Sequence, residues 1–167
     1  MPMKPSITFL SRLTLICLTL APIPVGPALA GVHLDAKDLL AGSDVVVQGE
    51  VIGLDQTMDA TQAHLRVSRA FKGPFKAGEL VQIQARGGKV YIEPGEPQFR
   101  SGTQCLLYLT KDAEGRYRCT NAADGLKLIV NENIYLFQDN PIHSVKLKGY
   151  LDELEAALKA SANPPSI

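Results

Sequence analysis

The three histidines could hold a metal or move a proton, but His33, His64 and His143 lie far apart along the chain. They do not form the His-x-x-x-His or His-Glu-x-x-His spacing that places two ligands on one helix face. Each is therefore expected to be a solvated or hydrogen-bonded side chain. His33 has a further option, since a chain beginning at Gly31 would start Gly-Val-His. Its amine, two amides and imidazole suit the square-planar geometry of Cu(II).

Catalytic motifs are missing from the sequence, which contains no Gly-x-Ser-x-Gly. The segment Gly87-Gly88-Lys89 lacks the Ser or Thr that follows the lysine of a phosphate-binding loop, so it is expected to be a turn. Glu93 and Glu96 flank Pro94-Gly95 and could place two carboxylates together. Nothing apolar surrounds them to separate their pKa values for acid and base work. We therefore expect no catalytic residues and no cofactor.

The segment 86–103 is the strongest candidate for a binding surface. It joins two expected strands and combines the glycine pair 87–88, a short apolar piece at 90–92 and a stiff stretch with the prolines 94 and 97. Stiff loops of this kind commonly carry function. The candidate binding residues are Arg86, Lys89, Tyr91, Glu93, Glu96, Phe99 and Arg100.

The first thirty residues have the layout of a secretory signal peptide. Lys4 and Arg12 are the only charged residues there, and an apolar run covers 7–20 before three prolines and Ala28-Leu29-Ala30. About 14 apolar residues are too few to span a bilayer as a helix, which needs roughly 20. We therefore predict cleavage after Ala30 and export to the periplasm or the medium, with no stable membrane insertion afterwards.

Cleavage would leave 137 of the 167 residues, the usual size of one domain. The basic count would fall from 17 to 15 against 17 acidic residues, a net charge of −2. Because the basic residues are also scattered, the chain lacks the positive field on which nucleic-acid binding depends. The sequence predicts a single domain over 31–160, a flexible tail at 161–167 and no nucleic-acid partner.

Two cysteines, Cys105 and Cys119, would remain in the exported chain. Residues 105–109 and 117–119 are typical of two strands, and 112–115 supplies turn residues. A hairpin centred near residue 112 would place Cys105 opposite Cys119 as cross-strand neighbours. In an oxidising compartment this predicts a structural disulfide. A redox or metal pair would be expected to have closer spacing, such as Cys-x-x-Cys.

The remaining chain alternates as β-strands do, between a short helix at 34–42 and an amphipathic helix at 147–158. Asp35 is a candidate N-cap and Gly42 a stop signal for the first helix. The further expected strands are 44–52, 63–71, 80–85, 126–130 and 134–137. Short strands, glycine-rich turns and a packed terminal helix predict a mainly β protein, a small OB-like β-barrel of five to seven strands.

Three segments carry a resemblance to a known family: 43–51, 67–73 with its Phe-Lys-Gly turn, and 102–109. Together they resemble the core of exported OB-fold domains of the netrin-like class, which includes the tissue inhibitors of metalloproteinases. The resemblance covers about residues 40–140 and implies a barrel that binds protein. Those inhibitors chelate the protease zinc through a free N-terminal cysteine, whereas the expected start here is Gly31. Their inhibitory residues therefore have no counterpart in this chain.

Three functions remain open from the sequence. The first is an exported, non-enzymatic binding module that holds a protein or small ligand on a barrel face or on the 86–103 loop, with a secreted protease as one partner. The second is an envelope structural or assembly protein without a ligand of its own. The third is an enzyme with carboxylates that converge only in the fold.

Overall fold

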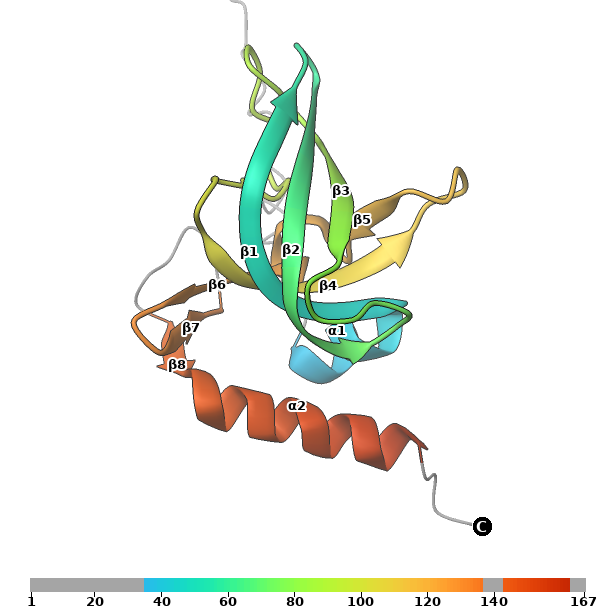
Figure 1. Ribbon diagram of the computed structural model, residues 1–167, viewed down its shortest axis with the longest axis vertical. Helices are drawn as coiled ribbons and strands as arrows, with labels where there is room; N and C mark the ends of the chain where they lie inside the picture. The colour runs from blue at the N-terminus through green and yellow to red at the C-terminus, as the bar shows by residue number, and fades with distance from the viewer. Residues whose placement is uncertain (1–34, 137–142, 163–167) are drawn as a thin grey trace, which may run out of the picture. The chain divides into compact units, whose positions relative to one another are not determined.

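The computed structural model describes residues 35–136 and 143–162, which form two helices, a 3-10 turn and eight strands (Figure 1). The predicted signal peptide, the expected start at Gly31 and His33 lie outside the described residues. The elements in chain order are α1 Ala36–Gly42, β1 Val45–Gln56, β2 Ala60–Lys72, β3 Leu80–Arg86, β4 Gln104–Lys111, β5 Tyr117–Cys119, η1 Ala122–Gly125, β6 Leu126–Val130, β7 Asn133–Tyr135, β8 Ser144–Lys146 and α2 Leu147–Ala162.

Five of the strands close into a barrel, as expected for an OB-like fold. Their order is β1-β2-β3-β5-β4, and β4 pairs back onto β1. All of these pairings are antiparallel except that of β3 with β5, which consists of the single bridge between Ile83 and Tyr117. The barrel is therefore continuous along four of its seams and thinly closed along the fifth.

Alternation along the strands sends one set of apolar side chains into the barrel. On β1, the side chains of Val45, Val47 and Val51 lie in the interior core, while that of Val46 lies in a second core outside it. This is the division that the sequence predicts. The interior also takes in Leu65 of β2 and Ile83 of β3, both fully buried.

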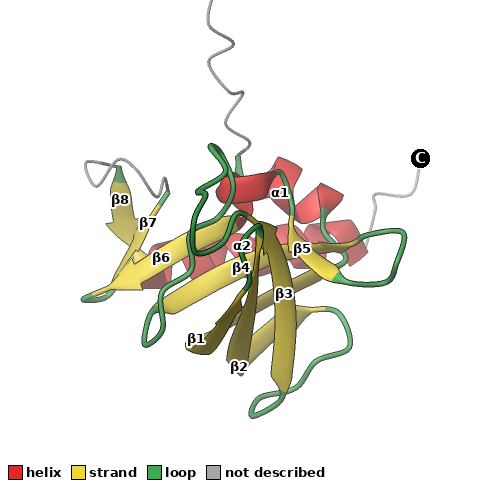
Figure 2. Ribbon diagram, turned by 90° about the horizontal axis from the view of Figure 1, so that it is seen from above, coloured by secondary structure: helices red, strands yellow, loops and turns green. Residues whose placement is uncertain are grey.

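The second core lies between the outer face of β1 and β4 and the two helices (Figure 2). Val46, Leu106 and Tyr108 form the barrel side of this core. Helix α1 begins at the predicted cap, where the Asp35 carboxylate accepts hydrogen bonds from the backbone N–H of Lys37 and Asp38 at 2.8 and 2.9 Å. The helix-covered face is therefore buried by segments from both ends of the described chain.

Helix α2 packs on this face with the apolar stripe that the sequence predicts. Tyr150 and Leu154 are buried, and Leu147, Leu151 and Leu158 pack partly buried beside them. The helix runs to Ala162, two residues into the segment expected to be a tail, and Ser161 Oγ donates a hydrogen bond to the Leu158 carbonyl. Within the described residues, neither helix is both long and apolar enough to cross a bilayer.

Strands β6, β7 and β8 extend the sheet beyond the barrel. Strand β4 is long enough to pair with β6 at 104–107 and with β5 at 109–111 on the same edge. Strand β7 stops at Tyr135, before the predicted strand end at Phe137, which lies outside the described residues. Lys127 of β6 is buried, and its ammonium donates a hydrogen bond to the Leu136 carbonyl at 2.7 Å.

The predicted disulfide between Cys105 and Cys119 is wrong, because both are free, buried cysteines. The two strands of the hairpin are as expected, but Cys119 lies opposite Leu109, and Cys105 is flanked by Gly49 and Leu128. Along β4, the Cα atom of Cys105 is four residue steps from that of Leu109, the cross-strand partner of Cys119, which is about 13 Å. A disulfide needs the Cα atoms of its two cysteines within about 7 Å.

The cause of the register error lies in the turn between β4 and β5. Asp112 Oδ1 accepts hydrogen bonds from the backbone N–H of Glu114 at 3.1 Å and Arg116 at 2.9 Å, and Gly115 has a φ of +79°. The turn is therefore centred on residue 114, because the aspartate side chain folds the backbone that follows it. Moving the centre by two residues moves the partner of Cys119 by four.

Candidate functional site

The predicted binding loop is fastened to the tip of the β1–β2 hairpin. Gly87 N–H donates to the Asp59 carbonyl at 2.8 Å, and Lys89 N–H donates to the Thr57 carbonyl at 2.9 Å. The Thr61 hydroxyl donates to the Gly87 carbonyl at 2.8 Å from a buried position. The loop therefore starts as an ordered extension of the barrel end and not as a free excursion.

Glycine is required where the loop meets the hairpin. A Cβ atom at Gly88 would lie 2.3 Å from the Thr57 carbonyl oxygen and 2.8 Å from the Met58 carbonyl carbon, far inside contact distance. Gly87 has a φ of +83°, a left-handed conformation that other residues adopt only with strain. The sequence predicts a turn here, and the structure adds that this turn fixes the loop against the hairpin.

The middle and end of the loop are anchored as well. The side chains of Pro97 and Phe99 are buried, and Phe99 belongs to the interior core. Gly95 accepts a hydrogen bond from Ala123 N–H, and Gly102 N–H donates to the Val51 carbonyl at 2.7 Å. Between these anchors and the hairpin contacts, residues 89–92 are all exposed.

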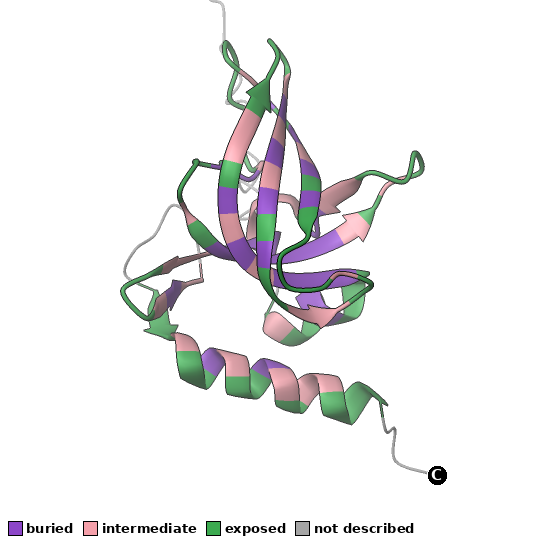
Figure 3. Ribbon diagram, viewed as in Figure 1, coloured by how far each residue is buried: buried purple, intermediate pink, exposed green. Residues whose placement is uncertain are grey.

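Four large apolar side chains stand in water where the loop and hairpin meet. Met58 and Val90 are each 74% exposed, Ile92 is 64% exposed and Tyr91 is 54% exposed. They are half of the eight large hydrophobic residues that are exposed in the described part of the chain. We call Met58, Val90, Tyr91 and Ile92 the tip cluster. Figure 3 shows exposed residues gathered at this end of the β1–β2 hairpin.

A pocket of about 230 Å³ lies beside the tip cluster, under the loop. Six of the seven predicted binding residues line it, namely Arg86, Lys89, Tyr91, Glu93, Glu96 and Phe99. Arg100 is exposed and is not part of this lining. The fold therefore brings together six residues that the sequence predicts to form a binding surface. Phe99 lines the pocket from the side of the interior core.

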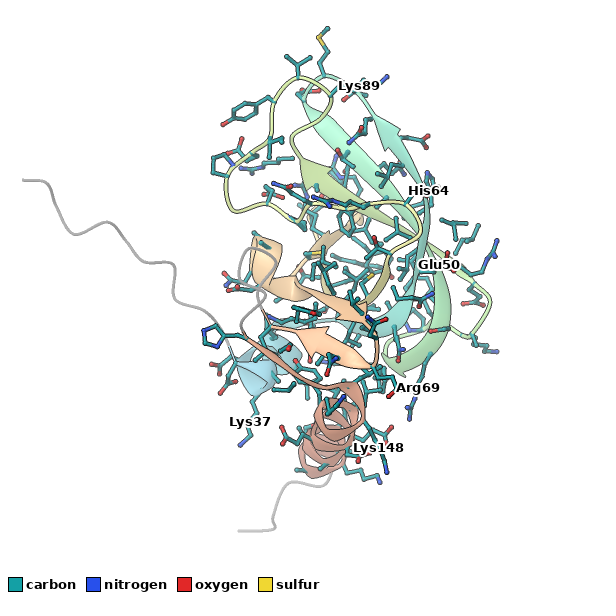
Figure 4. All side chains as sticks on the ribbon, turned by 90° about the vertical axis from the view of Figure 1, so that its left-hand side faces the viewer. Lys37, Glu50, His64, Arg69, Lys89 and Lys148 are labelled. Carbon is teal, nitrogen blue, oxygen red and sulfur yellow. The ribbon has the colours of Figure 1, made fainter. Side chains whose placement is uncertain are left out.

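The charges around the pocket are balanced. Arg86 and Lys89 oppose Glu93 and Glu96, and Glu96 Oε2 also accepts a hydrogen bond from Arg86 N–H at 3.3 Å. Figure 4 places the labelled Lys89 at the end of the barrel, remote from Lys148 of α2. A surface with equal numbers of both signs does not attract a strongly charged ligand from a distance.

Sequence reasoning missed the contribution of the β1–β2 hairpin, above all Met58, and also Gln56 and Thr61 in the pocket wall. One signal was present. Thr57-Met58-Asp59 puts a large apolar residue in the middle of a polar turn, where nothing in the local pattern buries it.

Chemistry at metals or nucleophiles has little support in the described residues. No three His, Cys, Asp or Glu side chains gather there closely enough to hold a metal ion. His64 lies on the outer barrel wall, where its Nε2 is 2.7 Å from Asp55 Oδ2, and His143 is exposed. The arrangement at the barrel end is suited to holding a partner by shape, apolar contact and a few polar groups.

Comparison with known proteins gives no relative from which a function could be transferred. No protein-family model matches the chain, and a search of the curated proteins also finds no match.

Proposed function

We propose that this chain is an exported, non-enzymatic binding module that holds a protein partner with the tip cluster and the adjoining pocket. The observation that carries the proposal is the exposure of Met58, Val90, Tyr91 and Ile92 on a scaffold fastened by backbone hydrogen bonds. Exposed apolar groups with a polar rim are typical of protein-binding surfaces. A pre-ordered loop also loses less conformational entropy when it binds.

The charge around the tip cluster favours a protein over a lipid surface. Membrane-surface segments usually carry an excess of Lys and Arg to meet anionic lipids. Here Arg86 and Lys89 are matched by Glu93 and Glu96, and Asp59 adds a further acid at the hairpin tip. Balanced charge around an apolar centre suits a partner with its own mixed rim.

We also propose that the likeness of this chain to the netrin-like class extends beyond the fold. The closed five-strand barrel is consistent with it at the level of the OB-like fold. If it holds, a secreted protease is one partner to assay, and inhibition of a secreted metalloprotease by the purified chain would be lost with Ile92→Asp. A complete lack of inhibition would rule out a protease inhibitor and would leave the proposed binding of another protein partner in place.

Site-specific photocrosslinking tests the tip cluster directly. A photoreactive phenylalanine analogue at position 92 is compared with the same analogue at position 130, since Val130 is another exposed apolar residue, 45% exposed on β6. We expect one discrete adduct with a second protein from position 92 and none from position 130. Identical adducts from both positions, or only an adduct between two copies of this chain, would overturn the proposal.

Gly88→Ala is a variant that changes the position of the loop and keeps the residues of the tip cluster. It leaves every tip side chain in the sequence but forces the loop away from the Thr57 and Met58 backbone, so the position-92 adduct should be lost while the circular dichroism spectrum is kept. Export is read separately by N-terminal sequencing of the protein recovered outside the cytoplasm. A chain beginning at Gly31 agrees with the proposal, and an intact Met1 contradicts it.

A further inference from the structure

A second concave surface lies on the outer wall of the barrel, over the seam between β3 and β5. It is a groove of about 370 Å³, the size of a small-molecule site. It shares no lining residue with the pocket at the tip. The groove is lined by Gln62, Phe75, Leu80, Val81, Gln82, Gln84, Gly115, Arg116 and Tyr117.

Three carboxamide side chains form one wall of this groove. Gln62 of β2 lies opposite Gln84 of β3 in the strand register, and Gln82 is the next outward-facing position along β3. Gln62 Nε2 donates a hydrogen bond to Gln82 Oε1 at 2.9 Å, which orients both side chains. Each amide carries donors and acceptors, so this pair alone leaves groups on both free for a ligand.

Gln84 is the unusual member of the wall. Its Oε1 atom is buried and has no hydrogen-bond partner, alone among the side-chain oxygen and nitrogen atoms that the structure describes as buried. A buried acceptor without a donor destabilises the folded state, and native proteins rarely retain one without a reason. Because Gln84 lines the groove, rotation of its amide toward a ligand hydroxyl or amide would supply the missing donor.

Apolar groups form the opposite wall. The rings of Phe75 and Tyr117 pack edge to face, with centroids 5.3 Å apart and an angle of 66° between the planes. On the amide side, Leu80 is 56% exposed and is the outward-facing position before Gln82 on β3, so it adds an apolar surface at that end of the groove. The seam is open here because β3 and β5 share only the bridge between Ile83 and Tyr117.

The cation at the rim is already neutralised. Arg116 forms ion pairs with Asp112 at 2.8 Å and Glu114 at 2.7 Å. Desolvation raises the pKa of Asp112, but hydrogen bonds from Arg116 and Arg118 outweigh it and hold that pKa well below its usual value. Asp112 therefore stays ionised and keeps Arg116 engaged, so the groove offers no unpaired cation to a phosphate.

We propose that this groove binds a neutral saccharide of one or two rings. A sugar ring offers apolar C–H faces to the aromatic wall and rows of hydroxyls that both donate and accept hydrogen bonds to the amide wall. An extended peptide is the alternative occupant, because the edge of β3 that faces β5 is paired only at Ile83, and binding of a peptide in place of a sugar is an outcome of the test. This site is independent of the tip cluster.

Nuclear magnetic resonance titration of the purified protein tests the groove. The probes are cellobiose, maltose and N,N′-diacetylchitobiose, each at millimolar concentration, with tri-alanine as the peptide arm. We expect at least one disaccharide to shift backbone amide signals of 80–84 and 115–117 while those of 88–92 stay in place. No shift with any of the sugars, or shifts with tri-alanine alone, would overturn the proposal.

Three variants separate recognition from folding. Gln84→Ala should weaken saccharide binding about tenfold, the loss of one good hydrogen bond. Gln104→Ala, the same change at an exposed position at the start of β4, should leave the affinity unchanged. Gln84→Leu should lose binding with a Tm that is kept or raised, because it removes the unpaired acceptor. Equal losses in Gln84→Ala and Gln104→Ala contradict the site.

The outcome is also distinguishable from that of the proposed function. With the photoreactive analogue at position 92, Gly88→Ala should abolish the protein adduct at the tip and leave saccharide titration untouched. Gln84→Ala should do the reverse.

Discussion

Two regions of the molecule direct apolar side chains away from the barrel interior. In one region these side chains are buried, and in the other they are exposed. On the helix-covered face, Val46, Leu106 and Tyr108 point outward and are fully buried by α1 and α2. At the tip cluster, residues of the same kinds, such as Val90 and Tyr91, point outward and stay in water. Within residues 35–136 and 143–162, helices therefore cover one apolar surface, while the tip cluster stays exposed.

The two regions also differ in what holds their backbone. The helix-covered face depends on side-chain burial, since its elements meet through packed side chains such as Leu39 and Leu154. The tip depends on backbone hydrogen bonds between the hairpin and residues 87–89 and on the close approach at Gly88. We therefore expect that apolar side chains at the tip can be changed without loss of the fold.

Matched truncations give the largest expected contrast between the regions. Leu154→Ala removes a side chain that is 2% exposed between α2 and the barrel, and should lower the free energy of unfolding by about 3 kcal/mol. Ile92→Ala at the tip should change it by less than about 0.5 kcal/mol. Urea denaturation of both variants measures the difference.

Equal effects would break the comparison. If Ile92→Ala destabilised the chain as strongly as Leu154→Ala, the tip would be part of the core in solution, and its exposure could not support the proposed function. Val145→Ala on β8, where the side chain is 41% exposed, serves as a control for an exposed residue outside the tip.

Loss of a buried hydrogen bond beneath α2 should have a smaller effect on stability, and this effect concerns only the helix-covered face. The hydroxyls of Tyr108 and Tyr150 lie 2.9 Å apart in a buried setting. Tyr150→Phe leaves the Tyr108 hydroxyl buried without this partner and should lower the free energy of unfolding by about 2 kcal/mol.

A double-mutant cycle checks that account. The pair Tyr108→Phe and Tyr150→Phe removes both hydroxyls, so it should be less destabilising than the sum of the single changes. Additive losses in urea denaturation would show that the two hydroxyls do not act as a pair.

Much of the barrel could be predicted because alternation along a strand reports directly which face is buried. The alternation from Val45 to Val51 predicts a strand with two apolar faces. The structure buries Val45, Val47 and Val51 in the interior core and Val46 in the second core. The capping of α1 by Asp35 and the stripe of α2 were equally readable, since both depend on residues near in sequence.

One prediction failed for a local reason. The predicted register of the β4–β5 hairpin was wrong because Asp112 Oδ1 accepts hydrogen bonds from the backbone N–H of Glu114 and Arg116, which centre the turn on residue 114. The other features that could not be predicted depend on contacts between distant segments. The pocket at the tip combined six predicted residues with Gln56 and Thr61, which reach it only because the hairpin folds beside the loop. The groove on β3 has no signature at all in the local sequence, since glutamines on a strand usually indicate no more than a solvated face.

Raising the pH gives the smallest expected effect and acts through groups in the buried regions. Burial raises the pKa of Cys105 to about 12 from an ordinary value of 9.0, and desolvation, the charge of Cys105 and that of Glu96 raise the pKa of Cys119. Below pH 9 both states hold these protons, so the stability is fully present. Above pH 9 only the unfolded chain releases them, so the free energy of unfolding falls as pH rises.

The expected fall is about 1 kcal/mol for Cys105 between pH 9 and pH 10, measured by urea denaturation in the presence of reductant. The pKa of Tyr108 and Tyr150 is also raised by burial, so a further fall follows above pH 10. The double change Cys105→Ala and Cys119→Ala should flatten the first part of the curve while the tyrosine part stays. A flat curve for the unaltered protein, or a 105–119 disulfide mapped by mass spectrometry without reductant, would contradict the free buried thiols. The disulfide would also return the β4–β5 register to the one that local turn residues predict.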